Sequence, residues 1–181
     1  VGRHAQAMAR LALADDDLEA MIAKPMPRGQ PSSHAFQQRF ARWLDATRKL
    51  GDKLDRAYSE VLAQKDATSS VAAAARFGEE AQVIWRGVMA SELPAELPGP
   101  AARETYCAEL KDAAEPFRAR ALESAQTCIA KASELAAGQE WADVCWRDGA
   151  QLDPAAFAPL RELRGAPEGF APPIAVEPPT E

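Results

Sequence analysis

Apolar side chains recur at steps of three and four residues along most of the chain, which is the spacing of one face of an α-helix. The longest series predicts a helix that begins after a cap at Ser32 or Ser33 and runs to about Gln64. Its apolar stripe consists of Phe36, Phe40, Trp43, Leu44, Thr47, Leu50, Leu54, Ala57, Tyr58, Val61 and Leu62. Gly51 weakens this helix, so we expect a bend or a close contact there.

Similar stripes predict four further helices, over residues 5–23, from after Ser70 to about 91, 101–137 and 140–150. Pro116 lies inside the fourth and predicts a kink or short interruption near Glu115. Gly138 predicts the C′ position that closes the same helix. Asp153 and Pro154 predict a final turn through Leu163. The expected fold class is all-α, built from antiparallel helical hairpins as a solenoid or a bundle.

Clusters of proline separate these helices, because proline lacks an amide hydrogen and pushes its predecessor out of the helical region. The breaks fall at residues 24–31 and 93–100. A third proline-rich stretch begins at Gly165 and carries only scattered apolar side chains. We therefore expect one helical domain over residues 1–164 and an extended or disordered tail over 165–181.

Composition supports a helical protein with an acidic surface. Apolar residues make up 47% of the chain, many of them alanine, which favours helices. The net charge of −6 argues against a surface for nucleic acid, which needs clustered Lys and Arg. No stretch approaches the 18 or so apolar residues of a membrane span. The chain begins at Val1 and not at Met, so we expect it to be a fragment of a longer protein.

The sequence offers no clear catalytic constellation. His4 lies near the terminus, and His34 at a helix start is typical of a solvated or capping residue. Cys107, Cys128 and Cys145 are too far apart for a zinc-type motif. No glycine-rich phosphate loop is present. These observations predict a protein that is not an enzyme and holds no cofactor or metal.

Two acidic runs have alternative interpretations. Residues 15–17, three successive Asp, could bind a divalent cation, but an exposed helix face is the simpler interpretation and the one we favour. Glu79 and Glu80 fall at positions that we expect to face solvent, without the buried surroundings that shift a pKa towards catalysis.

The four tryptophans lie on or beside apolar stripes. For Trp43, Trp85 and Trp141 we favour packing between helices over a partner-binding groove, although a groove would use the same residue types. The role of Trp146 stays open, because its neighbour Cys145 already takes the inward position.

Residues 53–162 resemble the C-terminal region of large tetratricopeptide-repeat (TPR) proteins of myxobacteria and other deltaproteobacteria, including proteins associated with adventurous gliding motility. The resemblance is carried, in order along the chain, by Tyr58–Leu62, Lys65–Asp66, Val71–Gly78, Leu93–Pro94, Leu97–Pro98, Tyr106, Leu110, Ala114, Pro116, Ala121, Ala125, Cys128, Ala132, Trp141, Cys145 and Leu152–Pro154. The family's aromatic-rich stretch is only partly kept in residues 81–85, and residues before Lys53 match nothing in it. No clean internal repeat of about 34 residues is visible.

The resemblance implies a TPR-like helical adaptor of the cell envelope, without catalytic residues. We therefore expect a non-catalytic scaffold that binds a protein or peptide partner and does not span a membrane. The alternative is a structural bundle that self-associates without a separate ligand. The implied location is the periplasm or cell envelope, with the cytoplasm as the alternative.

Cys128 and Cys145 are candidates for a disulfide. Their offsets from the turn near Gly138 place them at similar heights in an antiparallel hairpin, which leaves a disulfide and two buried thiols equally open. The resemblance, in which both positions recur, favours the disulfide. The bond would indicate an oxidising compartment, and Cys107 would stay unpaired.

Overall fold

A computed structural model describes residues 2–29, 31 and 33–157, and confirms an all-α fold. Helices make up 80% of the described residues, which contain no strand. The five helices are α1 (Arg3–Ile22), α2 (His34–Leu62), α3 (Ala67–Met89), α4 (Gly99–Leu135) and α5 (Gln139–Leu152). None of them is long and apolar enough to cross a membrane.

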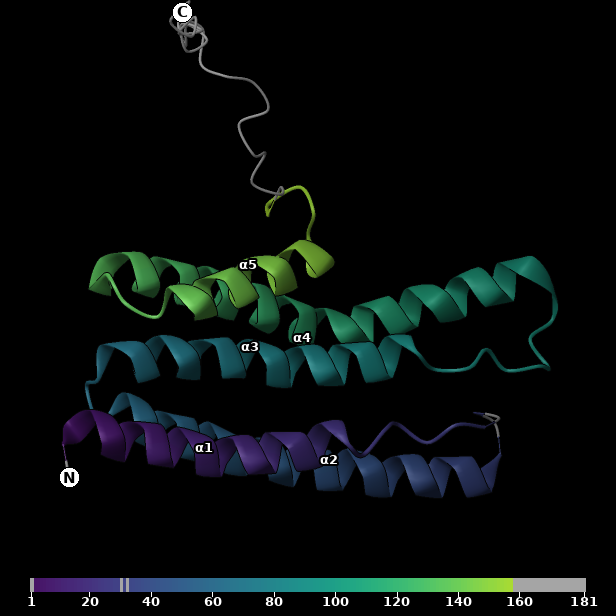
Figure 1. Ribbon diagram of the computed structural model, residues 1–181. Helices are drawn as coiled ribbons and strands as arrows, with labels where there is room; N and C mark the ends of the chain where they lie inside the picture. Colours follow the sequence, from purple (N-terminus) through teal and green to yellow (C-terminus); the bar gives the residue numbers. More distant parts are fainter. Residues whose placement is uncertain (1, 30, 32, 158–181) are drawn as a thin grey trace, which may run out of the picture.

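The helices form three layers, in which α1 and α2 make one, α3 the second, and α4 and α5 the third (Figure 1). Helix α3 packs against all four other helices and is covered on two sides. Its N-terminal half carries the run Val71–Ala75, in which every residue is buried. Small side chains allow neighbouring helices to approach α3 closely from both sides, which is why this helix can serve as the centre of the fold.

Two main apolar clusters fill the spaces between the layers. One joins α1, α2 and α3, and includes Leu11, Leu18, Leu54 and Tyr58. The other joins α3, α4 and α5 around Cys128 and Cys145, and includes Val71, Ala74, Ala75, Ala125, Ala132, Ala142 and Phe157. Helix α3 therefore contributes residues to both clusters, one on each of its two covered sides.

The starts of α2 and α3 have side-chain caps. Ser33 accepts a hydrogen bond from the Phe36 amide at 3.2 Å, as expected for the second helix. Helix α3 begins at Ala67, earlier than the sequence indicated, because the cap is Asp66, whose Oδ1 accepts from the Ser69 amide at 3.0 Å. The serines after Thr68 therefore lie inside the helix, and Ser69 is buried.

Helix α4 passes through Pro116 without interruption. Its two halves meet at an angle near the middle of the helix, which is the expected effect of a proline that removes a backbone hydrogen bond (Figure 1). The helix ends earlier than predicted, at Leu135, and Ala136 takes the left-handed position after it, with φ 47°.

Gly138 was expected to close α4 but instead precedes α5, with φ 65°. A Cβ at this position would come within 2.9 Å of Val71 Cβ. Two independent features therefore require glycine at position 138. The backbone is left-handed there, and the turn approaches α3 too closely for a Cβ atom.

After α5 the chain makes a turn that ends the described residues. Asp153 Oδ1 accepts from the amides of Ala155 and Ala156, both at 3.1 Å, so Asp153 caps this turn as expected. Phe157 packs back onto the α5 side of the core. The predicted continuation to Leu163, the domain boundary at 164 and the tail 165–181 lie outside the described residues.

Candidate functional site

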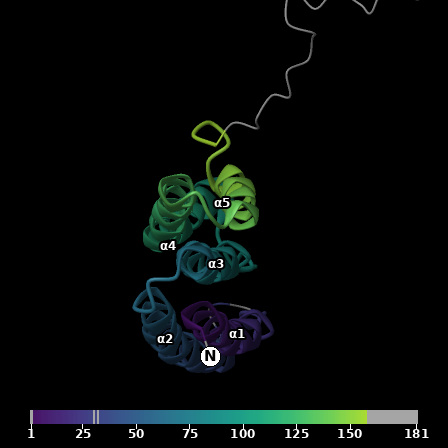
Figure 2. The same cartoon turned by 60° about the vertical axis from the view of Figure 1, so that its left-hand side comes forward.

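Figure 2 shows that α2 lies beside α1 in one outer layer and α4 beside α5 in the other, and that α2 and α4 are on the same edge of their layers. Two hollows follow α3 between α2 and α4, one of about 460 Å³ and one of about 130 Å³. The larger is lined by Ala74 and Phe77 of α3, and the smaller by Glu80 and Ile84, one to two turns further along the same helix. The two hollows share no lining residue, and we refer to them together as the α2–α3–α4 groove, with the larger as its apolar end and the smaller as its acidic end.

The apolar end has an exposed leucine on each wall. Leu62, the last residue of α2, is 39% exposed, and Leu135, the last residue of α4, is 40% exposed. Phe77 is half-buried and lines the same hollow. The sequence placed both leucines on inward apolar stripes, but no helix covers them in the described part of the chain, because α2 and α4 both pack on α3 and leave the groove between them open.

The acidic end contains a buried carboxylate. Glu80 is 2% exposed, and its Oε2 accepts no hydrogen bond from any described residue. The nearest cation is the guanidinium of Arg120 on α4, whose Nη2 lies 3.7 Å from Oε2. Arg120 also donates a hydrogen bond to Asp55 on α2, so it crosses the groove.

Burial raises the pKa of Glu80 to about 7, and the nearby Arg120 guanidinium only partly offsets this. Asp55 and Asp52 raise the pKa further through charge repulsion, Asp55 also through a hydrogen bond. The sequence-based expectation that Glu80 faces solvent is wrong. Because α3 is covered from two sides, a position opposite one apolar stripe faces another helix and not water.

Gly51 makes room for this carboxylate. A Cβ at Gly51 would lie 2.9 Å from Glu80 Oε1, closer than real side-chain contacts allow. The close contact that the sequence predicted at this glycine is therefore confirmed, and its partner is Glu80.

A second polar cluster ties α1 to α3. Arg76 binds Asp15 with two hydrogen bonds, from Nε to Oδ1 at 3.1 Å and from Nη2 to Oδ2 at 3.0 Å. The Tyr58 hydroxyl donates to the same Oδ1 at 3.1 Å, and burial together with Asp15 raises the pKa of Tyr58. The Arg76 guanidinium also lies 4.9 Å from the ring centre of Trp141. With its oxygens engaged by these donors, Asp15 is suited to holding helices together.

The run of three aspartates is thus only partly the exposed face that we expected. Asp16 is exposed, but Asp15 binds Arg76, and Asp17 Oδ1 accepts from Lys53 Nζ at 2.7 Å. Across residues 2–29, 31 and 33–157, no group of three or more His, Cys, Asp or Glu side chains is arranged to hold a metal ion.

The histidines lie at the ends of helices. His4 Nδ1 is 3.0 Å from Asp66 Oδ2 and remains exposed. His34, the first residue of α2, is exposed as expected. The two lie at opposite ends of the α1–α2 pair, near its start and at the far end of the connecting loop (Figure 1).

The tryptophans are all partly buried. Trp85 and Trp141 pack against the apolar clusters, as favoured by the sequence. Trp146 stacks edge-on against Phe157, with ring centres 5.8 Å apart. Trp43 donates from Nε1 to the Lys24 carbonyl at 3.0 Å and lines a further hollow of about 470 Å³ beside the 24–28 loop.

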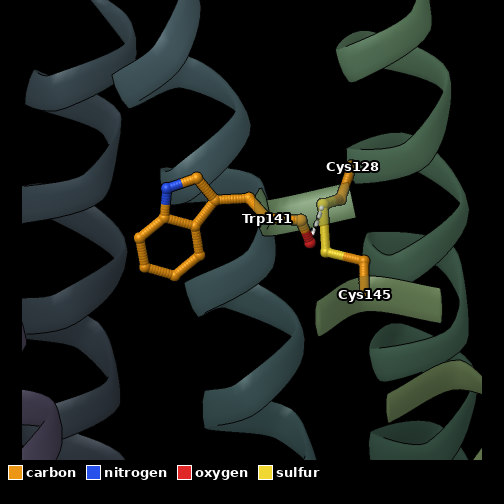
Figure 3. The surroundings of a disulfide bond; sticks show 3 residues. All are labelled: Cys128, Trp141 and Cys145. Atoms are coloured by element: carbon orange, nitrogen blue, oxygen red, sulfur yellow. Dashed lines mark hydrogen bonds between the residues drawn. A yellow bond between two sulfur atoms is a disulfide. The ribbon is translucent and has the colours of Figure 1, made fainter. Parts of the chain in front are cut away.

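Cys128 of α4 and Cys145 of α5 form a disulfide, with their Cα atoms 6.4 Å apart (Figure 3). Cys128 Sγ lies 3.5 Å from the carbonyl oxygen of Trp141, whose ring points away from the bond towards α3. Cys107, near the other end of α4, is a free thiol and partly buried. The disulfide links α4 to α5 covalently within the third layer of the fold.

Comparison with known proteins identifies no relative: no protein-family model, no curated protein and no solved structure matches this chain.

The α2–α3–α4 groove was not visible in the sequence. The signal that could have indicated it was the combination of a helical glycine, Gly51, with two apolar residues, Leu62 and Leu135, at the very ends of their helices.

Proposed function

We propose that this chain is a non-catalytic protein–protein interaction module that binds a segment of another protein in the α2–α3–α4 groove. The observation that carries the proposal is the pair of exposed leucines, Leu62 and Leu135, on opposite walls of an open hollow of about 460 Å³. Apolar side chains around a concave surface are typical of sites that take a peptide or a helix.

The polar groups near the groove are suited to binding a charged partner. The charged residues that line the hollow around Glu80 are Asp52, Asp55, Arg48 and Arg120. Carboxylates and guanidinium groups recognise charged partners through charge-assisted hydrogen bonds.

The proposed location is the periplasm or cell envelope, and the Cys128–Cys145 disulfide supports it, because such bonds persist in oxidising compartments. The resemblance to TPR proteins of gliding-motility machinery is consistent with a scaffold role in the envelope. A part in gliding motility itself rests on that resemblance alone.

Selection from a random peptide display library tests the proposed function. Peptides selected on the wild-type chain should lose binding to the double variant Leu62→Glu/Leu135→Glu, because charge replaces the apolar walls of the groove. The matched control is Leu13→Glu, since Leu13 is 69% exposed on α1 and lies outside the groove. Peptides that bind all three proteins equally, or a selection that yields none, would contradict the proposal.

Sedimentation across a wide concentration range separates the alternative function. A self-associating bundle would increase in mass with concentration, and the groove variants would abolish the increase. A monomer at all concentrations is expected for a module whose groove takes a different protein.

A further inference from the structure

We infer that the acidic end of the α2–α3–α4 groove is a subsite for a basic side chain, the ammonium of Lys or the guanidinium of Arg, carried by the bound segment. The inference rests on the proposed function and adds the chemistry of the partner. The observation behind it is the unpartnered Oε2 of Glu80, a buried residue that lines the smaller hollow.

A buried carboxylate oxygen without a donor is costly, because that oxygen has lost its water and gained no hydrogen bond in return. The Glu80 side chain is only 3% exposed, and its closest cation, Arg120, stays at 3.7 Å from Oε2 while it donates to Asp55. Oε2 is thus an acceptor without a hydrogen-bond donor, on a side chain that lines the hollow. An ammonium or guanidinium group provides the donors and the positive charge that this oxygen lacks.

The charges around the hollow favour a cation over an anion. From α2, Asp52, Asp55 and Arg48 line it, and from α4, Arg120 does. Above about pH 7, where Glu80 of α3 is ionised, three carboxylates face two guanidinium groups, one of which is already bound to Asp55. An anion entering here would meet the excess of negative charge, whereas a cation would reduce it.

The size and walls of the hollow suit a long basic side chain. Its volume of about 130 Å³ corresponds to roughly four water molecules at about 30 Å³ each. Leu44, Ile84 and Phe117 supply apolar wall beside the carboxylates. The methylene stem of Lys or Arg can lie along such a surface while its charged head reaches Glu80.

The two ends of the groove predict a spacing in the ligand. Ala74 lines the apolar end, and the acidic end extends from Glu80 to Ile84 on the same helix. At about 1.5 Å per residue, the centres of the two ends are about 12 Å apart. A helical ligand would therefore carry its apolar and basic residues seven or eight positions apart, and an extended one three or four positions apart, at about 3.3 Å per residue.

Parallel selections of the same random peptide library on the wild-type protein and on Glu80→Gln test the inference. Peptides from the wild type should be enriched in Lys or Arg at one position, at the predicted spacing from an apolar residue. Peptides from Glu80→Gln should keep the apolar residue and lose the basic one. Equal enrichment of the basic residue on both proteins, or none on either, would overturn the inference and leave the proposed function intact.

Affinity measurements on one enriched peptide complete the test. Replacing its basic residue by Gln should weaken binding to the wild type by about tenfold or more, and binding to Glu80→Gln by much less. Because Glu80 has a pKa near 7, wild-type affinity should also rise between pH 6 and pH 8, and affinity for Glu80→Gln should not. A pH profile shared by both proteins would contradict the subsite. A selection in which no peptide binds at all would instead remove the proposed function, and this inference with it.

Discussion

Glu80 and Gly51 face each other from neighbouring helices so closely that any side chain at position 51 would displace the Glu80 carboxylate. Position 51 lies inside α2, where glycine is less favourable than alanine by about 1 kcal/mol. Helix α2 is therefore less stable with Gly51 than it would be with alanine, and the space beside Gly51 is occupied by the buried Glu80 carboxyl group of α3. The acidic end of the groove depends on this pair.

The first prediction concerns the coupling of these two residues. Gly51→Ala should destabilise the wild-type chain by about 1 kcal/mol or more, because the new methyl displaces the carboxylate. In a Glu80→Ala background the same change should stabilise by up to about 1 kcal/mol, since only the helix preference remains. Denaturant unfolding of all four proteins gives the coupling. An identical effect of Gly51→Ala in both backgrounds would show that the contact carries no energy.

The second prediction concerns pH. The pKa of Glu80 is raised from 4.5 to about 7 in the folded chain, so the folded state binds the proton more tightly than the unfolded state. The stability that this proton provides is fully present below about pH 4.5 and is lost as the pH rises through about 7. The loss amounts to about 3 kcal/mol.

Glu80→Gln keeps the shape of the side chain without its charge. Its advantage in unfolding free energy over the wild type should grow by that amount between pH 4.5 and pH 8, as measured by urea titrations at several pH values. If the two proteins keep a constant difference over this range, Glu80 does not titrate as described.

The third prediction tests the tie between α1 and α3. Asp15→Ala leaves the Arg76 guanidinium and the Tyr58 hydroxyl without their shared acceptor. Because the side chains of Arg76 and Asp15 are 23% and 22% exposed, water partly compensates, and we expect a loss of about 2 kcal/mol. Asp16→Ala, at the exposed neighbour, should change stability by less than about 0.5 kcal/mol. Thermal unfolding of the two variants side by side makes the comparison, and equal effects would rule out a special role for Asp15.

The fourth prediction concerns the disulfide. The bond closes a loop with a sequence separation of 17, and replacing both Cys128 and Cys145 by alanine should cost about 3 kcal/mol in the chain-entropy model. Cys107→Ser should have a much smaller effect, since Cys107 lies outside this loop. Mass spectrometry of the non-reduced, alkylated protein should find one modified cysteine. Three modified cysteines would contradict the bond and weaken the proposed envelope location.

The sequence by itself determined the helices, because helical periodicity, caps and proline breaks act within a few residues of one another. Ser33 caps α2 as expected, and Pro116 lies inside α4 without breaking it. Local signals also explain the errors at helix ends. Asp66 and the serines of residues 69–70 are all suitable N-cap residues, so the local sequence does not decide where α3 begins. In the folded chain the N-cap is Asp66.

The tertiary structure alone decided the environment of Glu80 and the exposure of Leu62 and Leu135. One stripe per helix predicts one buried face, but α3 lies between two layers and buries the face that carries Glu80 as well. Conversely, the two leucines continue apolar stripes past the point where another helix covers them. Burial depends on which helices pack against a face, and that arrangement involves residues far apart in the chain, which the pattern of any single segment does not contain.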